Sequence, residues 1–143
     1  MGLFASLFVS KAPERPSGKK DVVYLMGPAN FRLEIIGEDQ YQAALEAICG
    51  PHLPKGVHLY ETASLILEDK NPHDQNAVRI EIQRKHVGYL SPETAMLLRA
   101  QLKAKGRPKS IAQCAAVIRG GWVSSDGRKG DFCVWLDLPI SYQ

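Results

Sequence analysis

The sequence contains little of what most catalytic or metal-binding motifs require. Its three cysteines, Cys49, Cys114 and Cys133, form no CxxC pair, so the usual spacing of a zinc site is missing. It also lacks a Gly-rich phosphate loop and any HxxxH, DxD or paired-carboxylate spacing. A metal nuclease built on the four histidines is therefore poorly supported, and we expect no catalysis, no metal and no cofactor.

Long apolar runs are also missing. No run approaches the roughly 18 residues of a membrane-spanning helix. Residues 1–10 are apolar but form a short stretch, and no basic residue precedes it, so this segment makes a poor signal peptide. An odd number of cysteines without a secretion signal is typical of reduced thiols. These features predict a cytoplasmic protein with no membrane contact.

Charge is unevenly distributed along the chain, although the net value is only +3. Residues 91–130 carry eight Lys or Arg against two Asp or Glu. A local cationic excess of this kind can attract a polyanion such as nucleic acid. A solvated, lysine-rich helix end would produce the same counts, so charge alone does not decide between the two.

Short alternating segments dominate the chain and predict mostly strands. We expect strands at residues 31–35, 57–67, 78–82, 110–119 and 132–138, another strand that ends at Tyr89-Leu90, and helices at 38–48 and 92–105. One face of the strand 57–67 is expected to carry Ala63, Leu65 and Leu67, and one face of the second helix Ala95, Leu98 and Leu102. The segment 110–119 is rich in alanine, which leaves a helix possible there. Asp126-Gly127 is a strong hairpin signal. Several short strands with two helices indicate a mainly β fold built on a small antiparallel barrel.

One domain is expected from this length, with a boundary near residue 30. Residues 11–20 hold two prolines, a glycine and four cations, which is typical of a flexible linker. The apolar stretch at 22–26 is interpreted as a short strand or a docking segment. We therefore assign residues 1–30 to a flexible N-terminal segment and residues 31–143 to the barrel, including a C-terminal hairpin extension.

The most informative stretch is Asn71-Pro72-His73-Asp74-Gln75-Asn76-Ala77, called the motif loop below. Asn71 and Asp74 are suited to accept hydrogen bonds from backbone N–H groups just ahead of them. Proline fixes one backbone dihedral, and the small Ala77 leaves room beside a barrel wall. A purely structural turn would need the same residues, so the loop alone does not establish a binding site.

Several elements in order resemble the HIRAN domain. They are Ile36-Gly37 before a helix, Leu67-Glu68-Asp69 leading into the motif loop, and His86-Val87-Gly88-Tyr89-Leu90 before a second helix. The resemblance covers roughly residues 31–105. It implies an OB-like or SH3-like barrel with two helices, found fused to helicases and nucleases of DNA repair or as an independent bacterial domain.

The resemblance also implies a ligand, the 3′ end of single-stranded DNA. By position, Asp74 corresponds to the aspartate that bonds the terminal 3′-hydroxyl. His73 and Tyr89 correspond to aromatic positions, and Tyr41 to a tyrosine in the first loop. Where the DNA-binding relative has a cation before that tyrosine, this chain has Asp39-Gln40. By position or proximity to the motif loop, we assign the interface to His73, Asp74, Asn76, Tyr89, Tyr41, Gln40, Lys70 and Lys85.

The function expected from these residues is single-stranded DNA binding without catalysis, in DNA repair, recombination or mobile-element processing. Cations on the second expected helix, Arg99, Lys103, Lys105 and Arg107, could add phosphate contacts. A helicase or nuclease acting in trans is the expected protein partner. The alternative is a peptide-binding barrel that uses Trp122, Trp135 and Phe132, although such aromatics commonly form the core of a small barrel.

Overall fold

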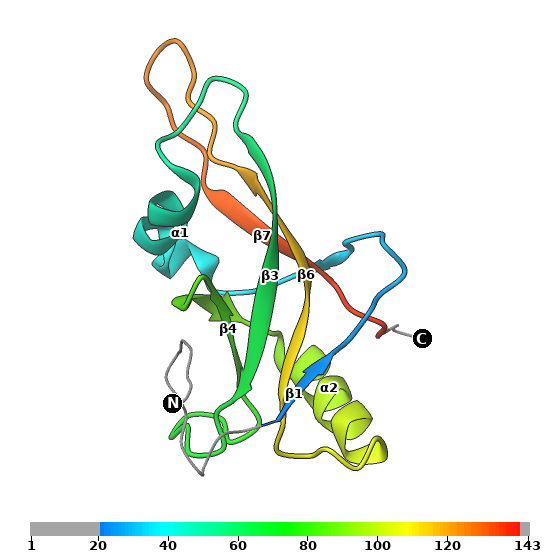
Figure 1. Ribbon diagram of the computed structural model, residues 1–143. Coiled ribbons are helices and arrows are strands. Elements are labelled where there is room, and N and C mark those ends of the chain that lie inside the picture. The colour runs from blue at the N-terminus through cyan, green and yellow to red at the C-terminus, as the bar shows by residue number, and fades with distance from the viewer. Residues whose placement is uncertain (1–20, 141–143) are drawn as a thin grey trace, which may run out of the picture.

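The computed structural model describes residues 21–140, so every expectation about residues 1–20 lies outside the described part of the chain. The elements are β1 Val22–Tyr24, β2 Leu33–Glu34, the 3-10 turn η1 Glu38–Gln40, α1 Gln42–Cys49, β3 Val57–Leu67, β4 Val78–Ile82, β5 Lys85–Tyr89, α2 Pro92–Ala104, β6 Ile111–Gly120 and β7 Phe132–Asp137. β3 and β6 run through the middle of the molecule along most of its length (Figure 1).

The seven strands of residues 21–140 belong to one sheet with the order β2-β7-β6-β3-β4-β5, and β1 lies beside β6. Every strand pair is antiparallel except β1 with β6. Ile36, just after β2, and Tyr89 in β5 exchange two backbone hydrogen bonds of 2.8 and 2.9 Å. This bridge joins the two ends of the strand order, and it confirms the mainly β, barrel-like fold with two α-helices.

Close backbone approach at that bridge depends on Gly88. A Cβ at this position would lie 2.7 Å from the Ile36 carbonyl oxygen and 2.7 Å from Ile35 Cδ1. The backbone φ of Gly88 is 153°, which side chains rarely adopt. A glycine immediately before Tyr89 therefore allows the sheet ends to meet.

The core follows from two sequence periods. Every second residue is buried in β4 and from Ala63 to Leu67 in β3, and Val78, Ile80 and Ile82 expose none of their surface. In α2 the residues Leu98 and Leu102 are also fully buried, at helical spacing. Burial of each such side chain stabilises the fold by roughly 1.5–3 kcal/mol. The expected inward residues of β3 and α2 are confirmed.

Ser91 caps the start of α2, as its position before Pro92 predicts. Its hydroxyl oxygen accepts a hydrogen bond from the Thr94 backbone N–H at 3.2 Å. The side-chain hydroxyls of the two residues also bond at 2.9 Å. The cap fixes where the helix begins, directly after the strand that carries Tyr89.

The N-terminal boundary was predicted too late. β1 pairs with β6, Leu25 is 3% exposed, and the backbone N–H groups of Ala29 and Asn30 bond the Asp137 carboxylate. Residues 21–30 therefore belong to the folded sheet. The sequence interpretation of residues 22–26 as a short strand was the better one.

Two elements are shorter than predicted. The expected strand 31–35 is a regular strand only at residues 33–34, and Phe31 cannot begin it because its φ of 49° is incompatible with a strand. The expected helix 38–48 divides into η1 and α1. Gln42 begins α1, and its side-chain amide bonds both the backbone N–H and the carbonyl of Phe132, at 2.8 and 2.9 Å.

The hairpin between β6 and β7 forms an arm, residues 121–131, that projects from one end of the molecule beside the loop 50–56 (Figure 1). Its turn contains Asp126-Gly127, as predicted, and Gly127 N donates to the Ser124 carbonyl at 2.9 Å. Phe132 is fully buried, whereas Trp122 is 42% exposed. The assignment of the aromatics to the core therefore holds for Phe132 and is wrong for Trp122.

All three cysteines are free thiols, and Cys114 is fully buried. Burial raises the pKa of the Cys114 thiol to about 12, so this thiol stays protonated and unreactive. Within residues 21–140, no helix has the length and apolarity to cross a membrane.

Candidate nucleic-acid interface

The motif loop is held by its own side chains. Asn71 Oδ1 accepts the backbone N–H groups of His73 and Asp74 at 2.8 and 3.1 Å. Asp74 Oδ1 accepts the N–H of Asn76 at 2.9 Å, and the Asp74 carbonyl accepts the N–H of Ala77 at 3.0 Å. These are the local hydrogen bonds that the sequence predicts. Among the described residues nothing bonds Asp74 Oδ2, so this oxygen can accept a hydrogen bond from a ligand.

Arg99 on α2 holds the C-terminal end of the motif loop in place. Its guanidinium donates to the Asn76 carbonyl at 2.9 Å, to the Ala77 carbonyl at 3.1 Å and to Asp69 Oδ1 at 2.8 Å. Lys109 Nζ reaches the other oxygen of Asp69 at 3.1 Å. The Arg99 guanidinium, with Lys109, holds the pKa of Asp69 below its usual range. Arg99 therefore supports the loop, and its three contacts leave it poorly placed for a phosphate.

Glu68, the residue after β3, gathers three donors. Its Oε1 accepts from Asn71 Nδ2 at 2.9 Å and from the Tyr89 hydroxyl at 3.1 Å, and its Oε2 accepts from Arg79 at 3.2 Å. Arg79 also contacts Glu81 at 3.0 Å. The charge of Glu68 is thereby compensated. Burial, followed by the bond to Glu68, raises the pKa of Tyr89, so its hydroxyl remains a donor at neutral pH.

Three aromatic rings lie in a row beside this network. The Tyr41 and His86 rings are 4.2 Å apart between centroids and tilted by 30°. His86 and Tyr89 are 4.9 Å apart and meet edge to face at 77°. Burial lowers the pKa of His86, and neighbouring Arg79 adds to this effect, so the imidazole is neutral at pH 7. The row offers ring surface without adding positive charge.

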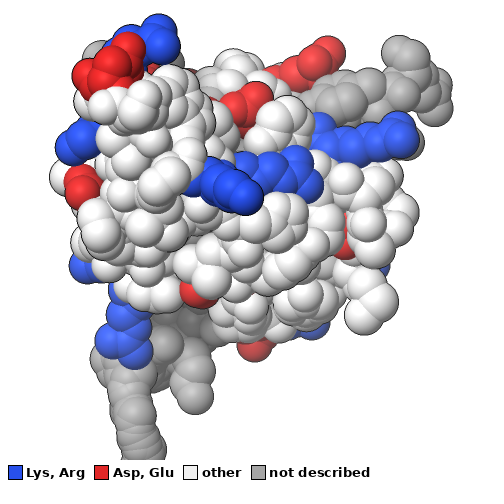
Figure 2. All heavy atoms as spheres, turned by 90° about the horizontal axis from the view of Figure 1, so that it is seen from above, with Lys and Arg blue, Asp and Glu red and all other residues white. Residues whose placement is uncertain are grey.

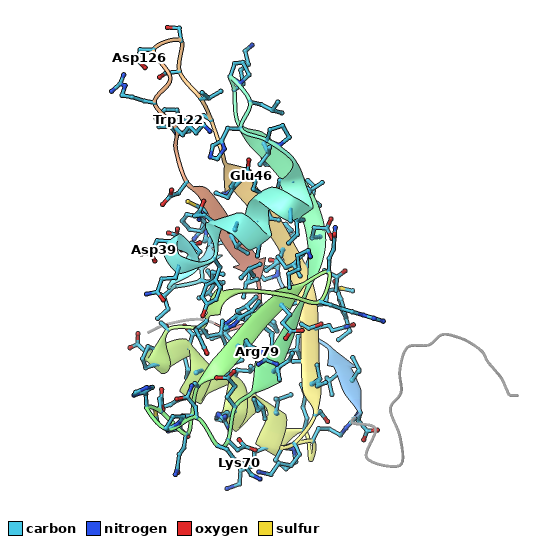
Figure 3. The ribbon with its side chains drawn as sticks, turned by 90° about the vertical axis from the view of Figure 1, so that its left-hand side faces the viewer. Asp39, Glu46, Lys70, Arg79, Trp122 and Asp126 are labelled. Atoms are coloured by element: carbon cyan, nitrogen blue, oxygen red, sulfur yellow. The ribbon has the colours of Figure 1, made fainter. Side chains whose placement is uncertain are left out.

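A groove of about 540 Å³ lies beside this network. Its wall is the continuous segment Ile66–Pro72, and Arg79 also lines it. Lys70 is exposed on this segment. Figure 3 shows Lys70 and Arg79 toward the end of the molecule that is opposite Trp122 and Asp126. Glu68 and Arg79 line the groove, and within the aromatic row Tyr89 bonds Glu68 and is opposite Arg79 in the sheet. We therefore describe the groove and the aromatic row together as the Tyr89 site.

The predicted interface residues separate into two groups. Tyr41 and Tyr89 belong to the aromatic row, Asp74 follows Asn71 in the motif loop, and Lys70 lines the groove. The others are less central. His73 is exposed, Asn76 supports the loop with its backbone, Gln40 is exposed on η1, and Lys85 begins β5 at the end far from Tyr89.

The sequence analysis gave no role in the site to Glu68, Arg79 or His86, and it did not predict that the Asn71 side chain donates a hydrogen bond. Arg79 pairs directly with Tyr89 in the sheet register, and β4 alternates buried and half-buried residues from Val78 to Ile82. The alternation in β4 therefore indicated that Arg79 lies on the outer face of the sheet, beside Tyr89. A tertiary network such as that of Glu68 has no equivalent signal in a single sequence.

The cationic excess of residues 91–130 does not converge on one surface. Arg99 and Lys109 pair with Asp69, Arg107 with Asp21, and Arg128 with Asp126. Viewed from the arm end, basic side chains are scattered among uncharged and acidic ones (Figure 2). The expectation that this helix supplies a row of phosphate contacts is therefore restricted to Lys103 on α2 and Lys105 at its C-cap, which are both exposed.

One group of possible metal ligands lies away from the Tyr89 site. Ligand atoms of Glu34, Glu38 and Cys133 are within 4.8 Å of one another. Burial raises the pKa of Glu38 to about 7 and that of Cys133 to about 11. A protonated thiol and a carboxyl with this pKa are weak ligands at neutral pH, and exposed Glu34 alone does not make a metal site.

Comparisons with known proteins found no match. This holds for protein-family models, for curated proteins and for solved structures alike. The side chains of the Tyr89 site and the sequence of the motif loop therefore carry the functional proposal.

Proposed function

We propose that this chain is a non-catalytic, HIRAN-like module that binds single-stranded DNA at the Tyr89 site. One observation supports this most directly. Tyr41, His86 and Tyr89 form a row of rings, and Tyr89 is connected through Glu68 to Asn71, which holds Asp74. Residues far apart in sequence thus join stacking surface to the motif loop.

Stacking supplies the affinity in this proposal. A base on an aromatic ring contributes roughly 1–3 kcal/mol with little dependence on sequence. Tyr89 and Tyr41 are both half-buried, so they are fixed in place and still present ring surface. Lys70 at the groove is positioned to neutralise a phosphate, which makes binding sensitive to salt.

In this proposal, Asp74 supplies the preference for the 3′ end of a DNA strand. A carboxylate oxygen accepts a hydrogen bond from a sugar hydroxyl and repels a phosphate. Because Oδ1 caps the turn at Asn76, Oδ2 is the atom available for a terminal 3′-hydroxyl. In a strand without a free end, a phosphate would occupy this position at an energetic cost.

A helicase or nuclease acting in trans is the partner that this proposal implies, in DNA repair, recombination or mobile-element processing, with the protein in the cytoplasm. An end-binding module without catalysis holds DNA for another enzyme. The resemblance to domains fused to helicases and nucleases motivates this partner.

Fluorescence anisotropy with matched oligonucleotides tests the proposal. We expect the tightest binding to a free 3′-hydroxyl, weaker binding to a 3′-phosphate, and weaker binding still when only a 5′ end is exposed. Affinity should fall as salt rises from 50 to 200 mM, since counterions are released on binding. Equal, weak and salt-insensitive signals for all three would contradict DNA binding.

Two variants separate the roles within the site. Asp74→Asn keeps an oxygen for the Asn76 N–H and removes the negative charge, so discrimination between 3′-hydroxyl and 3′-phosphate should shrink. Tyr89→Ala should weaken binding to every single strand by about fivefold or more. If Asp74→Asn leaves the discrimination unchanged, Asp74 only caps its turn.

A second candidate is peptide binding at the arm. Leu53 and Trp122 pair as a β-bridge, and they are 46% and 42% exposed. Exposed large apolar side chains that lie together often mark an interaction site. Binding of hydrophobic or proline-rich peptides that survives Tyr89→Ala and is lost in Trp122→Ala would favour this function over the first.

A further inference from the structure

A second group of aromatic rings stands on the outer face of the sheet. Tyr60 in β3 is 61% exposed, although two rings support it. Phe31 lies edge to face with it at 5.4 Å, and His58 does so at 5.1 Å, with His58 Nε2 3.1 Å from the Tyr60 hydroxyl. We call these three residues the Tyr60 cluster. Its central ring is both oriented and accessible.

The loop that carries Phe31 to Tyr60 contains two residues with strained backbones. Ala29 and Phe31 have φ values of 66° and 49°, in the left-handed region that side chains disfavour. The carboxylate of Asp137, which is 5% exposed, accepts the backbone N–H groups of Ala29, Asn30 and Phe31 at 3.0, 3.1 and 3.4 Å. Local strain of this kind persists where the surroundings impose it, and it often marks a functional surface.

The sheet register places the Tyr60 cluster on the same face as the Tyr89 site. Ile66 in β3 is opposite Arg79, and Arg79 is opposite Tyr89. Ile66 is six positions after Tyr60 in β3, an even step, so both side chains point to this outer face. The strand between them is roughly 20 Å long, at about 3.3 Å per residue.

Three small side chains lie on the outer face of the sheet between the two sites. Thr62 and Ser64 of β3 lie on the outer face, and Ala115 of β6 is opposite Thr62. None of them is bulky enough to block a chain that lies along the face. Asp137, opposite Ala115, has its charge engaged by three N–H groups. The larger side chains on the path are Gln113 and Glu81, both opposite Ser64, and the Glu81 carboxylate is paired with Arg79 at 3.0 Å. The path therefore carries little unpaired negative charge.

A cationic side chain lies near the Tyr60 cluster, at the end of the path away from the Tyr89 site. Arg119 in β6 is opposite His58, and its guanidinium lies 5.8 Å from the centre of the Trp135 ring. Exposed rings with a neighbouring arginine are the features that bind single-stranded nucleic acid without sequence preference. An apolar peptide would instead favour a surface without the polar tips of His58 and Tyr60.

We propose that the Tyr60 cluster is a second stacking site for the strand held at the Tyr89 site. A stacked strand advances about 3.4 Å per nucleotide, so roughly six nucleotides span the distance between the sites. Bases about five to eight positions from the bound 3′ end therefore stack on Tyr60. This inference rests on the proposed function, and it adds a length requirement to that function.

A length series of 3′-hydroxyl oligonucleotides, from 4 to 16 nucleotides, tests the second site by anisotropy. For the unmodified protein, affinity should rise once the strand passes about six nucleotides and then level off. Tyr60→Ala should weaken the 12-mer by at least about fivefold and leave the 4-mer unchanged. Tyr60→Phe should bind like the unmodified protein. Met96→Ala on α2, where Met96 is 60% exposed, is the matched control and should have no effect.

Abasic substitution gives a second measurement that does not depend on protein stability. A 12-mer with abasic sites at positions five to eight from the 3′ end keeps its phosphates and loses the bases. The unmodified protein should bind it as weakly as Tyr60→Ala binds the intact 12-mer, and Tyr60→Ala should show no further loss.

The outcomes distinguish the two proposals. If Tyr60→Ala leaves the affinity for the 4-mer and the 12-mer unchanged, or lowers both affinities equally, the second stacking site is overturned. The effect of Tyr89→Ala on affinity still tests the Tyr89 site in that case. If no oligonucleotide binds at any length, the proposed function and this inference both fail. If the Tyr60 cluster instead binds a peptide, Tyr60→Ala leaves the entire DNA length series unchanged.

Discussion

The hydroxyl of Tyr89 donates a hydrogen bond to Glu68 Oε1 at 3.1 Å, so the ring proposed to stack on a base is anchored by Glu68, three residues before the motif loop begins at Asn71. The same carboxylate accepts hydrogen bonds from the side chains of Asn71 and Arg79. Ring and loop are therefore oriented relative to one another before a ligand arrives. A ligand would then lose less of its binding energy to the ordering of side chains.

Removal of the shared acceptor should destabilise the protein. In Glu68→Ala, the donors of Tyr89, Asn71 and Arg79 lose their acceptor, and Arg79 Nε is already buried without a partner among the described residues. We expect the free energy of unfolding to fall by about 1–3 kcal/mol in urea denaturation. Glu68→Gln retains an oxygen and should lose less. Equal stability of Glu68→Ala and the unmodified protein would show that water replaces this network without cost.

Tyr89→Phe separates the ring from the hydroxyl. The phenyl ring still stacks, so affinity for single-stranded DNA should stay within about threefold of the unmodified protein, while Tyr89→Ala loses the ring and much more affinity. Anisotropy with a 3′-hydroxyl oligonucleotide measures both. If Tyr89→Phe binds as weakly as Tyr89→Ala, the hydroxyl acts on the ligand directly and the stacking role is wrong.

Arg99→Lys should loosen the motif loop. A guanidinium reaches Asp69 and the carbonyls of Asn76 and Ala77 together, whereas an ammonium group acts as one point charge. The loss of about 1–2 kcal/mol of local stability would accelerate hydrogen exchange of the Ala77 amide roughly 5- to 30-fold.

Lys103→Ala, at an exposed position of the same helix, is the control for Arg99→Lys and should leave exchange of the Ala77 amide unchanged. If Arg99→Lys also leaves it unchanged, the motif loop is held by Asn71 and Asp74 alone.

Strand periodicity made much of the fold predictable. β3 has the bounds expected from alternation, and its inward residues are Ala63, Leu65 and Leu67 as predicted. Such patterns depend on neighbours along the chain, and every residue of β3 contributes to the signal. The turn bonds of Asn71 and Asp74 were predictable for the same reason, because donor and acceptor lie within three residues.

Long-range contacts were not predictable in this way. The strand expected at 31–35 is shortened by Asp137, which is more than one hundred positions away and holds Phe31 in a left-handed conformation. Likewise, Arg99 has the pattern of a solvated helix cation and points back to the motif loop. Local propensity carries no information about such partners, so the sequence left the supports of the site unassigned.

Glu38 in η1 links this turn to β7 and makes the stability of the protein depend on pH. Its Oε2 accepts the Val134 N–H at 2.9 Å, and burial, with smaller contributions from neighbouring carboxylates such as Glu34, raises its pKa from 4.5 to about 7. Between these values the folded protein retains a proton on Glu38 that the unfolded chain has released. The free energy of unfolding should therefore fall as pH rises through this window and stay low above it.

Glu38→Gln removes this dependence and keeps an oxygen for the Val134 N–H. Because Glu38 is only half-buried, the difference between the two proteins should reach about 1–2 kcal/mol at pH 8, with the variant the more stable. At pH 5 the difference should be smaller, since Glu38 is then protonated in the folded state. Urea denaturation of both proteins at pH 5, 6, 7 and 8 measures it, and contributions from His86 cancel in the comparison. Parallel stability curves would contradict the raised pKa, and a less stable variant at pH 8 would show that the charged carboxylate is favourable at the Val134 N–H.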